Sequence, residues 1–322
     1  MKIGVLQFLG WADRSIPLQS VYERAIERFE IMDETGYDAV WLAEHHFSGF
    51  SVCPSVHMMA TMAAARTRRL RIGTAVSLAP FYHPLRLAEE IALLDNLSGG
   101  RVNWGAGRGF SRVEFEAFGV PVQESAGRFR EAVDVVLGAW TQERLSHAGE
   151  YFHFDGVEVL PKPLQQPHPP VWMAATSESA IDWAAGRGFS ILMDPHCTHV
   201  ELASKREHYG ARMKEAGFSA AAEREIPMAR LIAIGESAEQ AEAVARRGAA
   251  WTVGSYIGWG AREGVDPVER YVNEVIIHGT PASVIDQIRG LQETASLNYL
   301  LCAPLSQLSF NLITEKVLPA LV

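Results

Sequence analysis

The feature that most constrains the fold is a regular alternation of short, continuous apolar segments with longer amphipathic ones. The apolar residues of the short segments are consecutive, which is typical of strands that are buried on both faces. The longer segments have helical periodicity; residues 19–35, for example, place Val21, Ala25 and Phe29 at helical spacing and stop at Gly36. Eight segments are predicted to be strands: 2–9, 38–44, 70–78, 102–107, 170–175, 189–194, 226–234 and 298–303.

Eight strand–helix pairs predict an α/β fold of the (β/α)8 TIM-barrel type, with residues 1–322 forming a single domain. Such barrels typically need ~250 residues. The excess falls after strands four and seven, in residues 110–169 and 252–280, and both insertions leave the strand ends where barrel enzymes build their sites. The 252–280 insertion is rich in glycine, aromatic and charged residues, so it is the expected lid. A doubly wound sheet is the competing fold, but the turn after the first strand lacks the dinucleotide fingerprint.

Composition and charge argue against several classes of protein. The formal net charge is −9 and no run of lysine or arginine occurs, which argues against nucleic acid as a partner. No apolar run is long enough to span a bilayer, so no membrane association is expected. Three cysteines far apart in the chain fit a reduced, cytoplasmic protein better than a disulfide framework. The first residues enter a strand at once, so no signal peptide is indicated.

Three consecutive side chains with acid–base or metal-binding chemistry, Glu44, His45 and His46, follow the second predicted strand. Successive residues of a strand point to opposite faces, so the two histidines cannot both face the barrel centre. A metal site needs three or four converging ligands, and it would have to recruit distant residues such as His83 and His196. A metal is therefore not expected. Hydrogen bonds to the backbone at the barrel mouth are the alternative role for these side chains.

Other residues at strand ends are open to two interpretations. Arg108, in a glycine-rich turn after the fourth strand, is either a phosphate partner or a solvated charge. Thr176 and Ser177 precede a helix, where they are either ordinary N-caps or part of an anion site. Arg128, near the start of the 125–143 helix, is either a second anion partner or a surface charge. The small residues 74–77 either leave room for a planar ring or simply fill a narrow core.

These motifs, in this order, resemble those of the bacterial luciferase-like flavin monooxygenase family. The combination is much more specific than any single motif, and it spans nearly the whole chain. The matching segments are 36–47, which contains Glu44, His45 and His46, then 71–76, 83–90, 94–101, 171–177 and 278–281.

The resemblance implies a barrel that binds reduced FMN at the carboxyl ends of its strands. It places His45 near the reactive edge of the isoalloxazine ring, where it supports peroxyflavin chemistry. It also implies a non-prolyl cis peptide bond between Ala75 and Val76 beneath the ring. The contacts to the FMN phosphate that it implies are Arg108, Arg128, Thr176 and Ser177, and Ala175 is a further expected cofactor-binding residue.

One departure from the family pattern affects the expected activity. Luciferases proper carry a reactive cysteine in the turn after the fourth strand, where this chain has Gly107. The resemblance therefore implies a monooxygenase that does not emit light. After the fifth strand, Ala180 stands where a hydroxyl residue can occur, and Ser179 is the neighbour that would substitute for it.

The activity implied by the resemblance is that of a two-component monooxygenase. A separate flavin reductase would supply reduced FMN, O2 would form a peroxyflavin, and a small organic substrate would be oxygenated. Family members are commonly homodimers. One alternative is a deazaflavin-dependent enzyme that transfers hydride on the same barrel, and another is a flavin-binding protein without turnover. The residues expected to line the substrate pocket or lid are Trp11, Tyr82, His196, Tyr256 and Trp259.

Overall fold

The computed structural model describes residues 1–218, 224–255 and 266–322. Each predicted strand segment contains an observed strand, so the apolar segments identified every strand of the main repeat. Most observed strands are shorter than predicted because the predicted segments ran on into the site loops. The strands are β1 (Lys2–Gln7), β2 (Ala39–Leu42), β3 (Arg71–Thr74), β5 (Val102–Gly107), β8 (Val171–Ala174), β9 (Ser190–Leu192), β10 (Pro227–Ile234) and β12 (Tyr299–Pro304).

These strands form one curled, parallel sheet. The order of pairing is β10-β12-β1-β2-β3-β5-β8-β9, and every pair in it is parallel. A bridge beyond the end of β9 connects it to β10: the Met193 amide donates to Pro227 (2.9 Å), and the Ala229 amide donates to Met193 (3.1 Å). Two short strands complete the sheet, β4 (Ser77–Leu78) beside β5 and β11 (Ile277–Gly279) beside β10. The predicted segment 70–78 thus contains two strands, β3 and β4, whereas β11 was not predicted.

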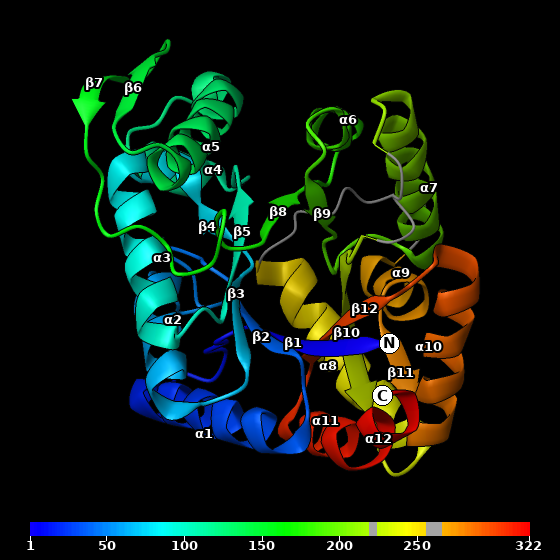
Figure 1. Cartoon of the computed structure of the whole chain (residues 1–322). Coiled ribbons are helices and arrows are strands. Elements are labelled where there is room, and N and C mark those ends of the chain that lie inside the picture. Colours follow the sequence, from blue (N-terminus) through cyan, green and yellow to red (C-terminus); the bar gives the residue numbers. More distant parts are fainter. Residues whose placement is uncertain (219–223, 256–265) are drawn as a thin grey trace.

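Helices surround this sheet, as Figure 1 shows. Each main helix turns an apolar face inward; in the first, Val21, Ala25, Phe29 and Met32 are buried, and the chain turns at Gly36 with a left-handed φ of 94°. The main helices are α1 (Leu18–Thr35), α2 (Val56–Arg66), α3 (Pro84–Ser98), α5 (Ser125–Thr141), α6 (Glu178–Gly186), α7 (His199–Glu215), α8 (Ala238–Ser255) and α10 (Pro281–Ala295). Three shorter helical segments close the chain: α11 (Gln307–Leu312), a π-helical turn (Ile313–Val317) and α12 (Leu318–Leu321).

Large aromatic side chains fill the interior of the curled sheet. The Trp41 indole is fully buried, donates a hydrogen bond to the Tyr299 hydroxyl (3.0 Å) and packs edge-on against Trp172. Gly73 on the neighbouring strand is required here because a Cβ atom would overlap the Trp41 ring. Free space is therefore left towards the carboxyl ends of the strands.

The connection between β5 and β8 carries the most added structure. It holds α4 (Arg112–Ala117), a 3-10 turn (Val122–Glu124), α5 and an antiparallel hairpin of β6 (Leu145–Ala148) and β7 (His153–Val157), which projects beyond α5 in Figure 1. Another 3-10 turn, Ala79–Phe81, precedes α3.

The expected lid segment, 252–280, is only partly described. Its first residues belong to α8, and α9 (Pro267–Glu274) and β11 form its second half. Tyr256 and Trp259 lie outside the described residues, so their part in a lid stays a prediction. Within residues 1–218, 224–255 and 266–322, no helix is both long and apolar enough to cross a membrane.

Candidate functional site

A pocket of about 440 Å³ opens where the strands end. Its walls come from the segments that follow six strands and from the facing sides of α5 and α6. Among the residues expected from the sequence it brings together His45, Ala75, Val76, Arg108, Thr176, Ser177 and His196. The residues that the sequence reasoning did not expect include Phe8, Phe129, Arg130 and Trp183.

His45 and His46 lie beyond the end of β2, and their side chains have different surroundings. The His45 ring lines the pocket and packs against Phe8 (6.3 Å between ring centroids) and Phe50 (5.5 Å). Its Nδ1 atom lies 3.9 Å from a carboxylate oxygen of Glu114, which also accepts the His46 backbone N–H (2.9 Å). The His46 ring points elsewhere and packs edge-on against Phe118.

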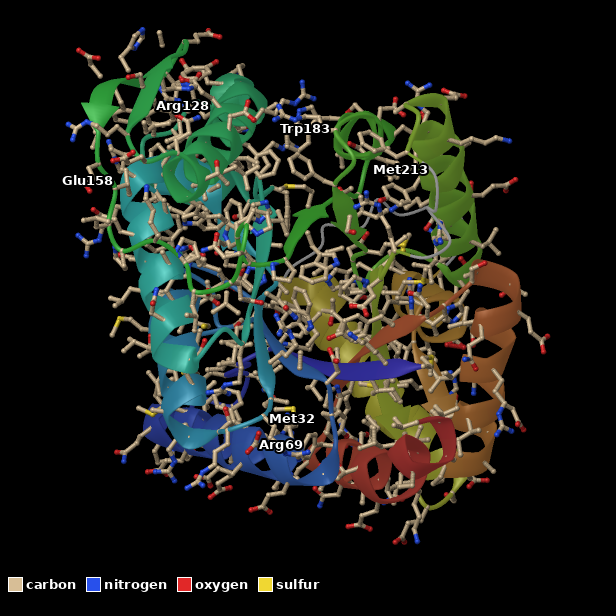
Figure 2. All side chains as sticks on the ribbon, viewed as in Figure 1. Met32, Arg69, Arg128, Glu158, Trp183 and Met213 are labelled. Atoms are coloured by element: carbon tan, nitrogen blue, oxygen red, sulfur yellow. The ribbon has the colours of Figure 1, made fainter. Side chains whose placement is uncertain are left out.

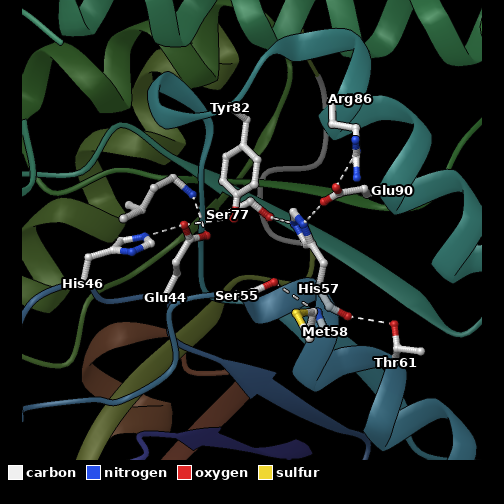
Figure 3. Close-up of polar contacts among 11 residues, drawn as sticks. Glu44, His46, Ser55, His57, Met58, Thr61, Ser77, Tyr82, Arg86 and Glu90 are labelled. Atoms are coloured by element: carbon white, nitrogen blue, oxygen red, sulfur yellow. Dashed lines mark hydrogen bonds and ion pairs between the residues drawn. The ribbon is translucent and has the colours of Figure 1, made fainter. Parts of the chain in front are cut away.

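Glu44 is a buried carboxylate that lines the pocket and accepts hydrogen bonds from residues behind the pocket wall. It accepts hydrogen bonds from His46 Nε2 (2.9 Å), from the Tyr82 hydroxyl (3.0 Å) and from the Leu78 backbone N–H (3.2 Å), as drawn in Figure 3. Burial and the neighbouring Glu44 charge raise the pKa of Tyr82, so its hydroxyl keeps the proton that it donates.

Two residues expected near the substrate lie outside the pocket lining. Tyr82 is held by Glu44 and packs against His57 instead. The Trp11 indole donates to the Ile16 carbonyl (2.8 Å) and is covered by Arg14. Both side chains are thus engaged in local packing.

One wall of the pocket is formed by Ala75 and Val76, and the peptide bond between them is cis. This bond confirms the cis peptide that the family resemblance implies. Val76 packs on Gly107, the residue that replaces the luciferase cysteine: a Cβ atom at this position would overlap the Val76 side chain. The two residues are therefore complementary, and Val76 leaves no room for a side chain there.

The opposite end of the pocket is basic and rich in hydroxyl groups. Arg108 reaches it from the end of β5 and donates to the Ser125 hydroxyl (3.4 Å). Ser177 caps α6 by accepting the Ala180 N–H (3.4 Å), so the positive end of that helix faces the same space. Ala175 is buried directly behind Thr176. This arrangement can bind an anion.

Arg130, rather than Arg128, lines the pocket. Arg128 pairs with Glu124 (2.8 Å) and covers the Tyr151 ring on the hairpin side of α5, where Figure 2 labels it. Residues two positions apart on a helix point in different directions, whereas Ala126, Phe129 and Arg130 share one face by their spacing. That spacing was the signal in the sequence that could have identified Arg130. Trp183, labelled between α5 and α6 in Figure 2, lies 5.7 Å from the Arg130 guanidinium.

His196 lines the pocket from the segment after β9. Its Nδ1 atom is hydrogen-bonded to the hydroxyl of the buried Tyr271, and its backbone N–H donates to Asp194 (2.9 Å). Burial lowers the pKa of His196 to about 4, despite the opposing charge of Asp194. The imidazole is therefore neutral at neutral pH.

No metal centre is found in the part of the chain that the structure describes. There, no three histidine, cysteine, aspartate or glutamate side chains gather so that they could hold a metal ion. The three cysteines are buried and unpaired with one another.

The luciferase-like monooxygenase family model matches residues 1–297. The oxygenase component of a flavin-dependent trigonelline monooxygenase from Acinetobacter baylyi is 30% identical over 230 residues, which are 70% of this chain and 63% of that protein. The chain spans no more than 63% of the length of the first curated relatives.

Two solved structures share the fold over the whole chain. The monooxygenase RslO1 from Streptomyces bottropensis superimposes with a TM-score of 0.83 at 25% identity and covers 100% of both chains. The oxygenating constituent of 3,6-diketocamphane monooxygenase from Pseudomonas putida, in complex with FMN, has a TM-score of 0.82 at 19% identity, covering 100% of this chain and 99% of that one. The chain belongs to the luciferase-like monooxygenase family, and it shares the fold of these two solved structures.

Proposed function

We propose that this protein is the oxygenase of a two-component, flavin-dependent monooxygenase. It would take reduced FMN from a separate flavin reductase and transfer one oxygen atom from O2 to a small organic substrate. The observation that carries the proposal is that one pocket unites His45, the Ala75–Val76 wall and a basic end at Arg108 and Arg130. The description of the trigonelline relative as an oxygenase component supports the separate reductase, and the FMN complex of the diketocamphane enzyme supports the cofactor.

The pocket walls fit a planar ring system. Small and apolar side chains make up much of the lining, and the Val76 side chain occupies the space beside Gly107. The ring-facing residues in this proposal are Leu6, Ala75, Val76, Gly107, Ala174, Leu192 and Ala229. Reduced FMN bound there would supply the electrons and the reactive carbon for oxygen activation.

The basic end of the pocket fits the FMN phosphate. Arg108 and Arg130 would supply charge-assisted hydrogen bonds, and the helix end capped by Ser177 would supply backbone N–H groups. An anion held there fixes which way the ring enters the pocket. The phosphate is therefore the group that orients the cofactor relative to His45.

His45 is the proposed catalytic residue. An imidazole can hold or give up a proton at a ring nitrogen, and Phe8 and Phe50 hold this ring in place while limiting access of water. Glu114, near Nδ1, favours a proton on that nitrogen. Exclusion of water protects a reactive bound oxygen species from wasteful loss.

The family expectation of a homodimer belongs to the same proposal. The neighbouring helices α2 and α3 each expose two apolar side chains one turn apart, Met58 and Met62 on the first and Leu93 and Leu97 on the second. Such exposed apolar faces mark interaction surfaces. A second copy covering α2 and α3 is the proposed arrangement.

One observation favours a second candidate function. His45 lines the pocket, and its Nδ1 atom lies 3.9 Å from the carboxylate of the buried Glu114 behind it. Such a pair can move the proton that accompanies hydride transfer between an alcohol and a deazaflavin. The same arginines would then hold the deazaflavin phosphate.

Matched arginine variants test the cofactor site. Arg108→Gln and Arg130→Gln should each weaken FMN binding about tenfold, because a charge-assisted hydrogen bond to the phosphate is lost. Their affinity for riboflavin, which lacks the phosphate, should be unchanged. Arg128→Gln is the control on the same helix, and it should bind FMN like the unmodified protein. Fluorescence titration with both flavins measures these affinities.

Two outcomes would contradict the proposed site. One is equal binding of FMN and riboflavin by the unmodified protein, which would mean that no phosphate site exists in this pocket. The other is a loss of FMN affinity in Arg128→Gln alone, which would place the phosphate on the outer side of α5.

A further inference from the structure

The pocket wall at Ala75 and Val76 is a bulge in the sheet. Pairing of β3 with β5 ends at Gly73 opposite Asn103, and it resumes in β4 with Ser77 opposite Ala106. The chain thus advances four residues on one strand and three on its partner. The bulge interrupts pairing with β5, although the Ala75 N–H still donates to the Leu42 carbonyl of β2 (2.7 Å). Ladder hydrogen bonds with β5 therefore do not fix where the bulge residues stand.

The first residue after the bulge is held by an array of three side chains that begins in the core and ends at the partly exposed Glu90. The Ser77 hydroxyl lies 2.9 Å from His57 Nε2, and His57 Nδ1 lies 2.9 Å from the Glu90 carboxylate. Ser77 and the His57 side chain are buried, and Figure 3 shows the array running from β4 through α2 to α3. The hydrogen bond from His57 lowers the pKa of Glu90, which therefore remains a carboxylate. Nδ1 then carries the proton, and Nε2 accepts the Ser77 hydroxyl.

Serine, imidazole and carboxylate in this order have the arrangement of an activated nucleophile. Ser77, however, has no exposed surface and does not line the pocket, so no substrate can reach its hydroxyl. The array therefore acts on the backbone to which Ser77 belongs.

The second residue after the bulge has its own anchor. The Leu78 N–H donates to Glu44, whose other oxygen accepts from Tyr82 and His46. Two carboxylates, the buried Glu44 and the partly exposed Glu90, thus hold consecutive residues next to the wall. Neither carboxylate network is needed for regular pairing of the sheet.

We propose that His57 and Ser77 are positioning residues that, together with Glu90, fix the Ala75–Val76 wall and thereby the seat of the flavin ring. The effect on the flavin rests on the proposed function, in which the ring lies on this wall. Through this array, α2 and α3 support the cofactor site without touching the cofactor.

Four variants separate this role from general stability. Ser77→Ala removes the hydroxyl. In His57→Asn the amide takes the place of Nδ1, so the link to Glu90 is retained and the link to Ser77 is lost. In His57→Gln the amide reaches the place of Nε2, so the contact with Ser77 is retained. Ser55→Ala is the matched control, because Ser55 caps the same helix through the Met58 N–H but does not contact the wall.

Two measurements are made on each full-length variant. Amide hydrogen exchange of the cofactor-free protein reports whether the segment 74–82 is held. Titration with oxidised FMN reports affinity and the visible absorption spectrum of the bound ring. Ser77→Ala and His57→Asn should exchange faster in this segment, bind FMN about tenfold more weakly and shift the spectrum. His57→Gln should lie closer to the unmodified protein, and Ser55→Ala should change only the melting temperature.

Each other result has a definite meaning. Unchanged exchange in Ser77→Ala and His57→Asn overturns the anchoring, and so does an equal effect of Ser55→Ala. Faster exchange with unchanged FMN affinity and spectrum overturns the link to the cofactor seat. Failure of the unmodified protein to bind any flavin contradicts the proposed function, and the exchange data then still decide whether the array holds the wall.

Discussion

His45 and His46 are adjacent in the chain but lie in different environments. His45 faces the pocket between two phenylalanine rings, whereas His46 joins the buried Glu44 network. The two side chains therefore have separable roles, one towards the bound ligands and one towards the fold. Variants at these two positions can test that division.

His45→Ala should abolish oxygenation while FMN affinity stays within severalfold, because the phosphate contacts are untouched and only the proton-handling group is lost. His46→Gln is the control, since its amide can still donate to Glu44. Incorporation of labelled oxygen from O2 into members of a substrate panel measures oxygenation. Full oxygenation by His45→Ala would disprove the assigned role.

His196 should make stability depend on pH. Its folded pKa of about 4 lies below the ordinary value of 6.5, so the unfolded chain binds its proton first as the pH falls. Stability is complete above pH 6.5 and decreases towards pH 4; at pH 5 the loss from this group is about 2 kcal/mol. Urea unfolding at pH 7.5 and pH 5 should show a smaller decrease for His196→Gln. An identical decrease in both proteins would show that His196 is not buried in neutral form.

The arginines show what could be predicted about single residues. Arg108 comes directly after the last residue of β5, so its place at the carboxyl end of that strand could be predicted, and it lines the pocket. Arg128 was expected from the family motif, but helix geometry turns Arg130 into the pocket instead. Which face a helix presents depends on its packing, here on the contact between Phe129 of α5 and Trp183 of α6, which are distant in sequence from each other.

At the scale of elements, the β6–β7 hairpin depends on one carboxylate. Glu131 on α5 accepts the backbone N–H groups of Glu150, Tyr151 (3.1 Å) and Phe152 (2.8 Å), and it also contacts His147. A two-stranded hairpin is marginally stable in isolation. The hydrogen bonds to Glu131 thus hold the turn of the hairpin against α5.

Glu131→Ala should free the hairpin without unfolding the barrel. Three N–H groups lose a charged acceptor, each such bond being worth about 1.5–3 kcal/mol, while the sheet of the barrel is untouched. Limited proteolysis should then cut within residues 144–157. Glu150→Ala is the control, since only its backbone contacts Glu131 here. Equal protease resistance of both variants and the unmodified protein would refute this dependence.

Strands could be predicted where burial on both faces requires a segment of apolar residues. All eight strands of the main repeat are covered by apolar neighbours on both sides, so their segments are continuously apolar. The hairpin strands are short and partly exposed, and their residues carry no such signal. β11, which was not predicted, has only three residues, and the predicted segment 70–78 is divided into β3 and β4 by the bulge at Ala75 and Val76.

At the scale of the whole molecule, the curled sheet brings motifs that are far apart in the sequence together in one pocket. The loops that follow β1, β2, β3, β5, β8 and β9 meet at one end because the strands are parallel. Apolar packing of Trp41 and Tyr299 fills the interior below them. A ligand can therefore reach the site from the end where these loops meet.

The most direct test of the central claim is oxygen uptake by the protein loaded with reduced cofactor. The protein is mixed without air with reduced FMN or with a reduced deazaflavin, unbound cofactor is removed, and oxygen is then admitted. The account predicts that reduced FMN is retained and that oxygen is consumed as it is reoxidised. Retention of the deazaflavin alone, with no oxygen consumed, would contradict it.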